Sequence, residues 1–287
     1  MAYILNDPSI FGTEPLNPFL VYYLSVGDSI FGGNFVPLTM RWLEANNIRY
    51  RKFVYYSIQS GNVQLLQYLH RQGYPFYLEV CDTAAKYGQL ECLKYLHETG
   101  YMRSEWTCTF AAEYGHLDCL RYAHEHGFRW GDVCGKAATH GQLDCLIYAH
   151  TEGCKWSEWT CASAAVNGHL GCLRYAHENG CPWNVQTCAA AASYGHLDCL
   201  IYAHEHGCPW DEETCNRAAK NGHLDCLIYA HKNGCPWDKR TTKDAASNQH
   251  LDCLAYAIEN GCPWGKRECS KHYTSDVLDY LISKGLC

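Results

Sequence analysis

A histidine, an aspartate and a cysteine stand close together at His116, Asp118 and Cys119. A cysteine beside a histidine can act as a nucleophile, because the imidazole takes the thiol proton. The same trio returns at His196/Asp198/Cys199 and at His223/Asp225/Cys226. An active site has no reason to recur along a chain, and the sequence has no Gly-rich phosphate loop, nucleophile elbow or His-Glu-x-x-His motif. We therefore predict no enzyme activity, no catalytic residue and no cofactor.

The 20 cysteines and 16 histidines suggest a second chemistry, metal binding. Cys226 and His231 are five residues apart, whereas two ligands on one helix face stand four apart. Zinc needs its ligands about 2.0–2.3 Å from one centre, but equivalent residues of adjacent packed helices lie on the order of 10 Å apart. The spacing favours buried cysteines and partly buried histidines over a metal site. A thiol-rich metal or redox buffer is the alternative, and zinc in elemental analysis would reveal it.

The recurrence of these residues has a fixed period. The stretch Gly195–Thr214 (GHLDCLIYAHEHGCPWDEET) returns with few changes from Gly115, Gly168 and Gly222. With the weaker copies included, the starts fall at 61, 88, 115, 141, 168, 195, 222 and 249, so each copy spans 26 or 27 residues. A constant period of this length is typical of a solenoid, in which each unit stacks on the next.

One unit, residues 209–234, reads as two helices. Asp211 is a good N-cap for the first helix, and Asn221-Gly222 ends it, because glycine takes the left-handed conformation after a helix. The second helix is predicted over Leu224–His231, with an apolar face. Equivalent N-caps are Ser104, Ser157, Asn184 and Asp238. The predicted fold is an all-α solenoid of stacked antiparallel helix pairs.

The ends of the chain depart from the repeat. Residues 1–32 do not fit it, and we expect an irregular N-terminal cap there, followed by the array over 33–287 with a degenerate first copy from Gly33. Gln249 replaces the turn glycine of the last copy, and we expect it to strain that turn. Residues 275–287 keep a helix pattern and are predicted to form a C-terminal capping helix.

The cysteines, histidines and aromatic residues occupy fixed places in each copy. Cysteines locked to the repeat in a chain with no export signal are expected to be small buried residues in a reducing compartment. The histidine that ends each second helix, such as His204, is expected to cap the helix, with a pH-dependent change in stacking as the alternative. Recurring tyrosines and tryptophans are expected to pack between repeats, with the tyrosine hydroxyls reaching solvent.

Charge and hydropathy narrow the functional class. The chain has 23 Lys and Arg residues against 30 Asp and Glu residues, a net charge of -7, which argues against a general nucleic-acid binder. It lacks a stretch of roughly 18 apolar residues, so we predict no membrane span. The N-terminus does not read as a secretory signal. We expect an intracellular monomer.

The repeat resembles the ankyrin repeat family. Cys215 takes the family's Leu place before Ala218-Ala219, Gly222-His223 matches its Gly-His, and Gly234-Cys235 takes its terminal Gly-Ala. The period is 27 rather than the usual 33, and the Thr-Pro-Leu-His motif is absent. The resemblance therefore implies β-hairpin fingers that are shortened or absent. The cysteine- and tyrosine-rich variant is similar to short ankyrin arrays of giant viruses of amoebae, which implies host cytoplasm as its location.

The positions that vary between copies could encode a partner, and they lie at the start of the first helix. Ankyrin arrays present this helix on their concave side. Exposed tryptophans anchor many interfaces, so Trp106 and Trp159 are the leading candidates. The full candidate set is Glu105, Trp106, Phe110, Glu158, Trp159, Glu212, Glu213, Arg217, Lys239, Arg240, Lys243, Lys266, Arg267 and Lys271.

The predicted function is a protein–protein interaction scaffold or adaptor, viral and host-directed, whose partner is an unidentified protein, of an amoebal host if the chain is viral. The candidate residues from the first repeats of the array are acidic and aromatic, and those from the last repeats are basic. A nucleic-acid or anionic-lipid contact through the C-terminal basic patch is the alternative. Binding that falls steeply with added salt would distinguish it from a protein contact.

Overall fold

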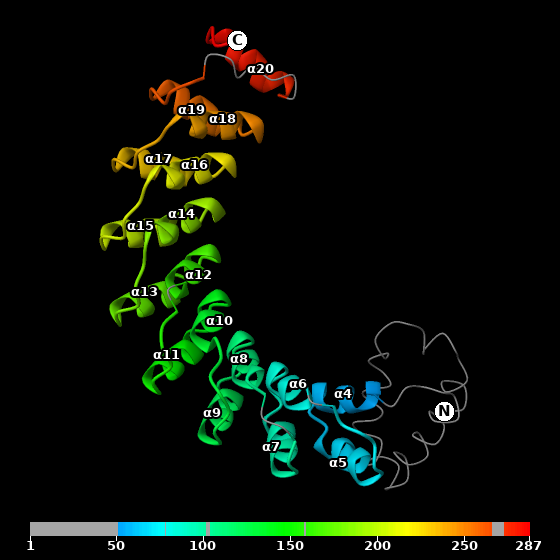
Figure 1. The fold of residues 1–287 in the computed structure, drawn as a ribbon. Coiled ribbons are helices and arrows are strands. Elements are labelled where there is room, and N and C mark those ends of the chain that lie inside the picture. The colour runs from blue at the N-terminus through cyan, green and yellow to red at the C-terminus, as the bar shows by residue number, and fades with distance from the viewer. Residues whose placement is uncertain (1–50, 78, 102–103, 158, 266–272) are drawn as a thin grey trace, which may run out of the picture. The chain divides into compact units, whose positions relative to one another are not determined.

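A computed structural model describes residues 51–77, 79–101, 104–157, 159–265 and 273–287. The regular elements of these residues are 17 α-helices, with no strand among them (Figure 1). The chain divides into two compact units, Met1–Gly131 and Asp132–Cys287, which we call unit 1 and unit 2. The predicted N-terminal cap and the degenerate copy from Gly33 lie outside the described residues.

Each repeat contributes an A-helix and then a B-helix. In unit 1 the A-helices are α4 (Arg51–Gln59), α6 (Val80–Lys86) and α8 (Trp106–Glu113), and the B-helices are α5 (Val63–Arg71), α7 (Leu90–Glu98) and α9 (Leu117–Glu125). In unit 2 the A-helices are α10 (Val133–Thr139), α12 (Thr160–Val166), α14 (Val185–Tyr194), α16 (Glu212–Lys220) and α18 (Lys239–Ser247). Its B-helices are α11 (Leu143–Thr151), α13 (Leu170–Glu178), α15 (Leu197–Glu205), α17 (Leu224–Lys232) and α19 (Leu251–Glu259), followed by α20 (Ser275–Ser283).

Within each unit, an A-helix packs against its own B-helix and against the A-helices before and after it (Figure 1). Small residues allow this close approach: Cys215, Ala218 and Ala219 of α16 are fully buried. Leu227 of α17 is also fully buried and fills the space between the helices. The prediction of an all-α solenoid of stacked helix pairs is confirmed. Only residues 206–211 separate α15 from α16, and they form no hairpin finger.

The turn inside seven of the eight described pairs of A- and B-helices contains a glycine with positive φ. Gly168 has a φ of +72°, in the left-handed region, and a Cβ placed on it would lie 2.5 Å from Nδ1 of the next repeat's His196. The His196 ring is held there, because its Nε2 lies 3.1 Å from the Val166 carbonyl oxygen. The described residues include one non-glycine with positive φ, Gln249 at +65°. Gln249 lies between α18 and α19, and α20 is the helix after α19. The N-cap of α20 is Thr274, whereas a histidine, such as His169 of α13, holds that place in other repeats.

The predicted N-caps are confirmed at three positions. Asp211, Asn184 and Asp238 have extended backbones, and each side chain accepts a hydrogen bond from the backbone N–H two residues later. Ser104 and Ser157 make the same kind of bond, to the N–H of Trp106 and Trp159. Their helices, however, begin one or two residues later than the sequence suggested, at Trp106 and Thr160.

The recurring tyrosines pack between repeats, as predicted: the ring of Tyr229 lies 6.4 Å from that of Trp210. The sequence did not predict that their hydroxyls also meet histidines. Tyr229 Oη lies 2.9 Å from Nδ1 of His204, which belongs to the preceding repeat, and the His204 ring is stacked on Trp210 at 3.9 Å. The contact recurs between five other pairs of repeats, joining His70 to Tyr95, His97 to Tyr122, His150 to Tyr175, His177 to Tyr202 and His231 to Tyr256. These histidines therefore link one B-helix to the next.

The cysteines are mainly core residues. Eighteen of them are buried thiols. Burial raises the pKa of Cys226 and of Cys145 to about 12, with a nearby aspartate contributing in each case. Cys287, by contrast, is disulfide-bonded.

Candidate partner-binding site

The predicted site residues are spread over both units. Glu105, Trp106 and Phe110 lie at the start of α8 in unit 1. The unit 2 candidates lie at the starts of helices, with Trp159 before α12, Glu212, Glu213 and Arg217 on α16, and Lys239, Arg240 and Lys243 on α18. Glu158, Lys266, Arg267 and Lys271 lie outside the described residues. Trp106 is 53% exposed and Trp159 54%, unusually high for tryptophans.

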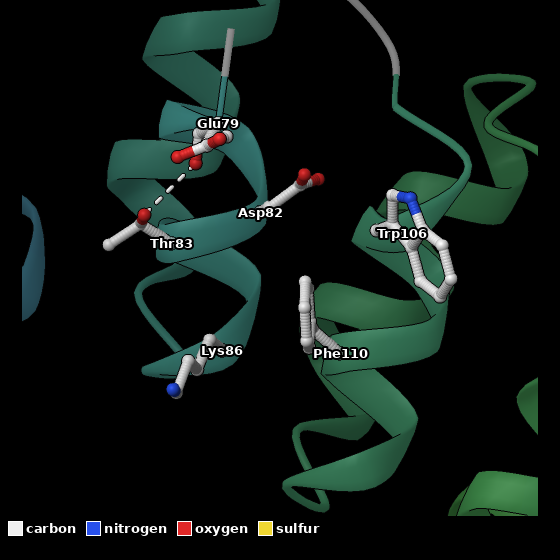
Figure 2. A pocket seen from close by; sticks show the side chains of 6 residues that line it. All are labelled: Glu79, Asp82, Thr83, Lys86, Trp106 and Phe110. Atoms are coloured by element: carbon white, nitrogen blue, oxygen red, sulfur yellow. Dashed lines mark hydrogen bonds between the residues drawn. The ribbon is translucent and has the colours of Figure 1, made fainter. Parts of the chain in front are cut away.

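Trp106 and Phe110 form one wall of a recess between α6 and α8, which we call the Trp106 recess (Figure 2). Its volume is about 440 Å³. The lining residues are Glu79, Asp82, Thr83, Lys86, Trp106 and Phe110. In Figure 2, Asp82 projects from α6 toward α8, and Phe110 projects from α8 toward α6. The recess thus combines an aromatic wall with two carboxylates.

Local structure positions the aromatic wall. The Ser104 hydroxyl oxygen accepts a hydrogen bond from the Trp106 N–H at 3.0 Å, which fixes the first turn of α8. Trp106 and Phe110 are four residues apart and share one face of the helix. Their ring centroids are 6.3 Å apart. Phe110 is half-buried, whereas the neighbouring Trp106 ring is more exposed.

The acidic wall is built into the helix contact. Asp82 is only 7% exposed, and its Oδ1 accepts a hydrogen bond from the Thr107 hydroxyl of α8 at 2.6 Å. Burial raises the pKa of this carboxyl, the Thr107 and Ser104 hydroxyls oppose the rise, and the negative charge of Glu79 adds to it. Glu79 is exposed and accepts a hydrogen bond from the Tyr55 hydroxyl at 3.2 Å.

Among the described residues of the lining, Lys86 is the one basic side chain. Its ammonium lies 5.1 Å from the ring centroid of Tyr114 and 5.8 Å from that of Tyr87, within reach of cation–π attraction. Because Lys86 ends α6 whereas Glu79 precedes it, the cation and the carboxylates occupy different ends of the recess. The lining has two acidic residues and one basic residue.

The same recess recurs in unit 2 between α16 and α18, with a volume of about 430 Å³, and we call it the Arg240 recess. The repeat relates six lining residues pairwise: Glu213 to Glu79, Asn216 to Asp82, Arg217 to Thr83, Lys220 to Lys86, Arg240 to Trp106 and Asp244 to Phe110. Asn216 even repeats the hydrogen bond of Asp82, accepting from Thr241 at 2.6 Å. The two recesses are therefore formed by equivalent positions of the repeat that carry different side chains.

Side chains that line the Arg240 recess form ion pairs. The guanidinium of Arg240 lies 2.7 Å from a Glu213 carboxylate oxygen, 3.3 Å from one of Glu212 and 3.0 Å from one of Asp238. Arg217 also pairs with Glu213, at 3.4 Å. Four of the predicted partner-binding residues are thus engaged with one another. Lys239 and Lys243 of α18 are exposed.

Sequence comparison of the copies missed Glu79, Asp82 and Lys86, because the set of variable positions began at Glu105. Their places in the repeat could have identified them. Glu79 stands two residues before Cys81, as Trp106 stands two before Cys108. Asp82 follows Cys81 directly, as Thr109 follows Cys108. Within the part of the chain that the structure describes, no three His, Cys, Asp or Glu residues form a group that could hold a metal ion.

Two comparisons with known proteins bear on the family of the repeat. The family model described as ankyrin repeats (many copies) matches residues 108–150. The match supports the ankyrin repeat family. A crystal structure of the human ASB11 ankyrin repeat domain is similar in fold, with a TM-score of 0.52 and 18% sequence identity, over 64% of this chain and 98% of that chain. At that identity the similarity shows the ankyrin fold alone.

No curated protein sequence matches the chain. Among the described residues, no helix combines the length and apolar character needed to cross a membrane.

Proposed function

We propose that the chain is a protein-binding scaffold that contacts its partner along the exposed starts of the A-helices, with the Trp106 recess as the central contact. Ankyrin repeats generally mediate protein–protein interaction, and the family match over residues 108–150 supports that role. The observation that carries the site is Trp106, 53% exposed on the wall of a recess. Aromatic anchors beside pockets supply much of the binding energy of protein interfaces.

The partner that we propose is a protein of an amoebal host, with the chain acting as a host-directed viral adaptor in the host cytoplasm. The support is the resemblance of the cysteine- and tyrosine-rich repeat to the short ankyrin arrays of giant viruses. A contact along the A-helix face suits such a role, because residues at the helix starts differ between copies while the stacking residues recur.

The test is capture of proteins from an amoebal lysate on the immobilised full chain, with quantitative mass spectrometry. We expect Trp106→Ala and Trp159→Ala to lose proteins that the natural chain retains. Both tryptophans are about half exposed, so each substitution should change the free energy of unfolding by no more than about 0.5 kcal/mol. Tyr194→Ala is the matched control, because Tyr194 is 57% exposed and outside the candidate set. Equal recovery of every protein by all four chains would contradict the assignment.

The ion pairs of Arg240 weigh against the alternative contact with nucleic acid or anionic lipid. Its charge is neutralised by Glu212 and Glu213 within the fold. A polyanion would have to compete with these carboxylates, and such binding would fall steeply with added salt. The burial of the thiols likewise weighs against the metal or redox buffer, as does the raised pKa of thiols such as Cys226, because the thiolate is the form that binds metal and reacts.

A further inference from the structure

We propose that the Trp106 recess binds an arginine side chain of the partner protein. This inference rests on the proposed function and names the chemistry that the recess would recognise. The observation behind it is internal to the chain: the same recess occurs twice, and in one copy the chain's own Arg240 lines the recess and pairs with a carboxylate of the opposite helix.

The Arg240 recess shows how this frame accommodates a guanidinium. Glu213 on α16 holds the Arg240 guanidinium of α18 at 2.7 Å. The equivalent of Glu213 in unit 1 is Glu79, so the carboxylate is retained. The equivalent of Arg240 is Trp106, so unit 1 keeps the acid and lacks the arginine on the neighbouring helix. A guanidinium supplied from outside would restore the pair.

The replaced side chains also suit an external arginine. A guanidinium is planar and weakly hydrated, stacks on aromatic rings and forms two hydrogen bonds to a carboxylate. Trp106 and Phe110 of α8 offer the rings, while Asp82 of α6 and Glu79, which precedes α6, offer the carboxylates (Figure 2). Asp82 adds a buried acid where the Arg240 recess has the neutral Asn216. A lysine side chain would also be attracted by the carboxylates, but it would stack less well on the rings and could not form the paired hydrogen bonds of a guanidinium with a carboxylate.

Charge and size agree with this occupant. The described lining of the Trp106 recess has two acidic residues and one basic residue, whereas the described lining of the Arg240 recess has three basic residues and two acidic ones. Lys86 is directed to the Tyr114 and Tyr87 rings at the far end of α6, away from Glu79. A volume of about 440 Å³ is within the range of pockets that take a small ligand or a side chain.

The experiment uses the full chain and a displayed library of random heptapeptides. Peptides are selected on the natural chain and depleted on Trp106→Arg, in which the new guanidinium should pair with Glu79 as Arg240 pairs with Glu213. The affinity of the selected peptides is then measured by fluorescence anisotropy. We expect the peptides to share an arginine. Replacing it by citrulline, which is neutral and similar in shape, should weaken binding about tenfold, the loss expected for one cation–π and carboxylate contact.

Variants separate the arginine contact from general effects on the fold. Glu79→Gln should weaken the arginine peptides and leave their citrulline versions unchanged. Gln186→Arg is the control for Trp106→Arg, because Gln186 holds the same place in its repeat of unit 2. It should leave peptide binding unchanged.

The outcomes distinguish this inference from the proposed function. Trp106-dependent peptides without arginine, or with equal affinity for citrulline, would overturn the arginine pocket and leave the protein-binding site standing. Peptides that bind Trp106→Ala and Trp106→Arg as well as the natural chain, or a selection that yields none dependent on Trp106, would contradict both.

Discussion

His204 Nδ1 lies 2.9 Å from the hydroxyl oxygen of Tyr229, which belongs to the next repeat of unit 2. The hydrogen bond joins α15 to α17, two B-helices whose other contacts are few compared with those of the A-helices α14 and α16. Since it recurs from repeat to repeat, each tyrosine hydroxyl stabilises an interface rather than a single helix.

Tyr229→Phe removes this link and little else. We expect it to lower the free energy of unfolding by about 0.5–1.5 kcal/mol, the net value of one hydrogen bond, as measured by chemical denaturation. Tyr194→Phe is the control and should have no measurable effect, because Tyr194 is 57% exposed. Equal stability of the two variants would show that the His204 contact contributes nothing.

Stability should depend on pH through His177. Burial, with the charge of His206 adding to it and Glu178 opposing it, lowers the pKa of His177 below its ordinary value of 6.5. The unfolded chain therefore takes up a proton at a higher pH than the folded chain, so stability is complete above about pH 6.5 and falls as the pH drops toward the folded pKa. Melting temperatures should decrease from pH 7.5 to pH 5.5, and His177→Asn should make the decrease smaller. Parallel curves for the two chains would contradict a role for His177.

Two glycines of one repeat separate backbone strain from a steric contact. Gly168 and Gly180 both have positive φ, at +72° and +81°, but only Gly168 would bring a Cβ against a neighbour, the His196 ring. Gly180→Ala should cost about 1 kcal/mol for the left-handed backbone. Gly168→Ala should cost about 1–3 kcal/mol more, the usual penalty of overpacking. Denaturation of both variants gives the difference directly, and equal costs would mean that the His196 ring moves aside freely.

The buried thiols should be unreactive in the folded chain. Burial and neighbouring aspartates raise the pKa of Cys226 to about 12, so its thiolate is scarce at pH 8. With a colorimetric disulfide reagent at that pH, the buried thiols whose pKa is raised, such as Cys226 and Cys145, should react only as the chain unfolds. The same sample in guanidinium is the control and should react at once. Rapid reaction of the native chain would favour the thiol-buffer alternative.

Local rules predicted the helix pairs well. The N-caps Asp211, Asn184 and Asp238 and the turn glycines act through residues within one or two turns, so the sequence alone places them. At Ser104 and Ser157 the capping side chain was predicted correctly and the first helical residue was not. The strained turn at Gln249 was also expected, and its φ of +65° agrees.

The local rules for caps and turns could not predict contacts between repeats. The tyrosine hydroxyls were expected to reach solvent, yet they meet histidines 25 residues earlier in the chain. Glu79 and Asp82 were not selected, although they share a recess with Trp106. Arg240 was selected as a partner-binding base, and its charge is held by Glu212 and Glu213.

The sequence by itself therefore determined the repeat, the helix pairs, their caps and the exposed tryptophan at position 106. Only the tertiary structure decided that Trp106 shares a recess with Glu79 and Asp82, while Arg240, at the same place in another repeat, pairs with Glu213. The reason is physical: capping and turn conformation depend on the backbone of a few neighbouring residues, whereas a recess forms where side chains of successive repeats pack against one another.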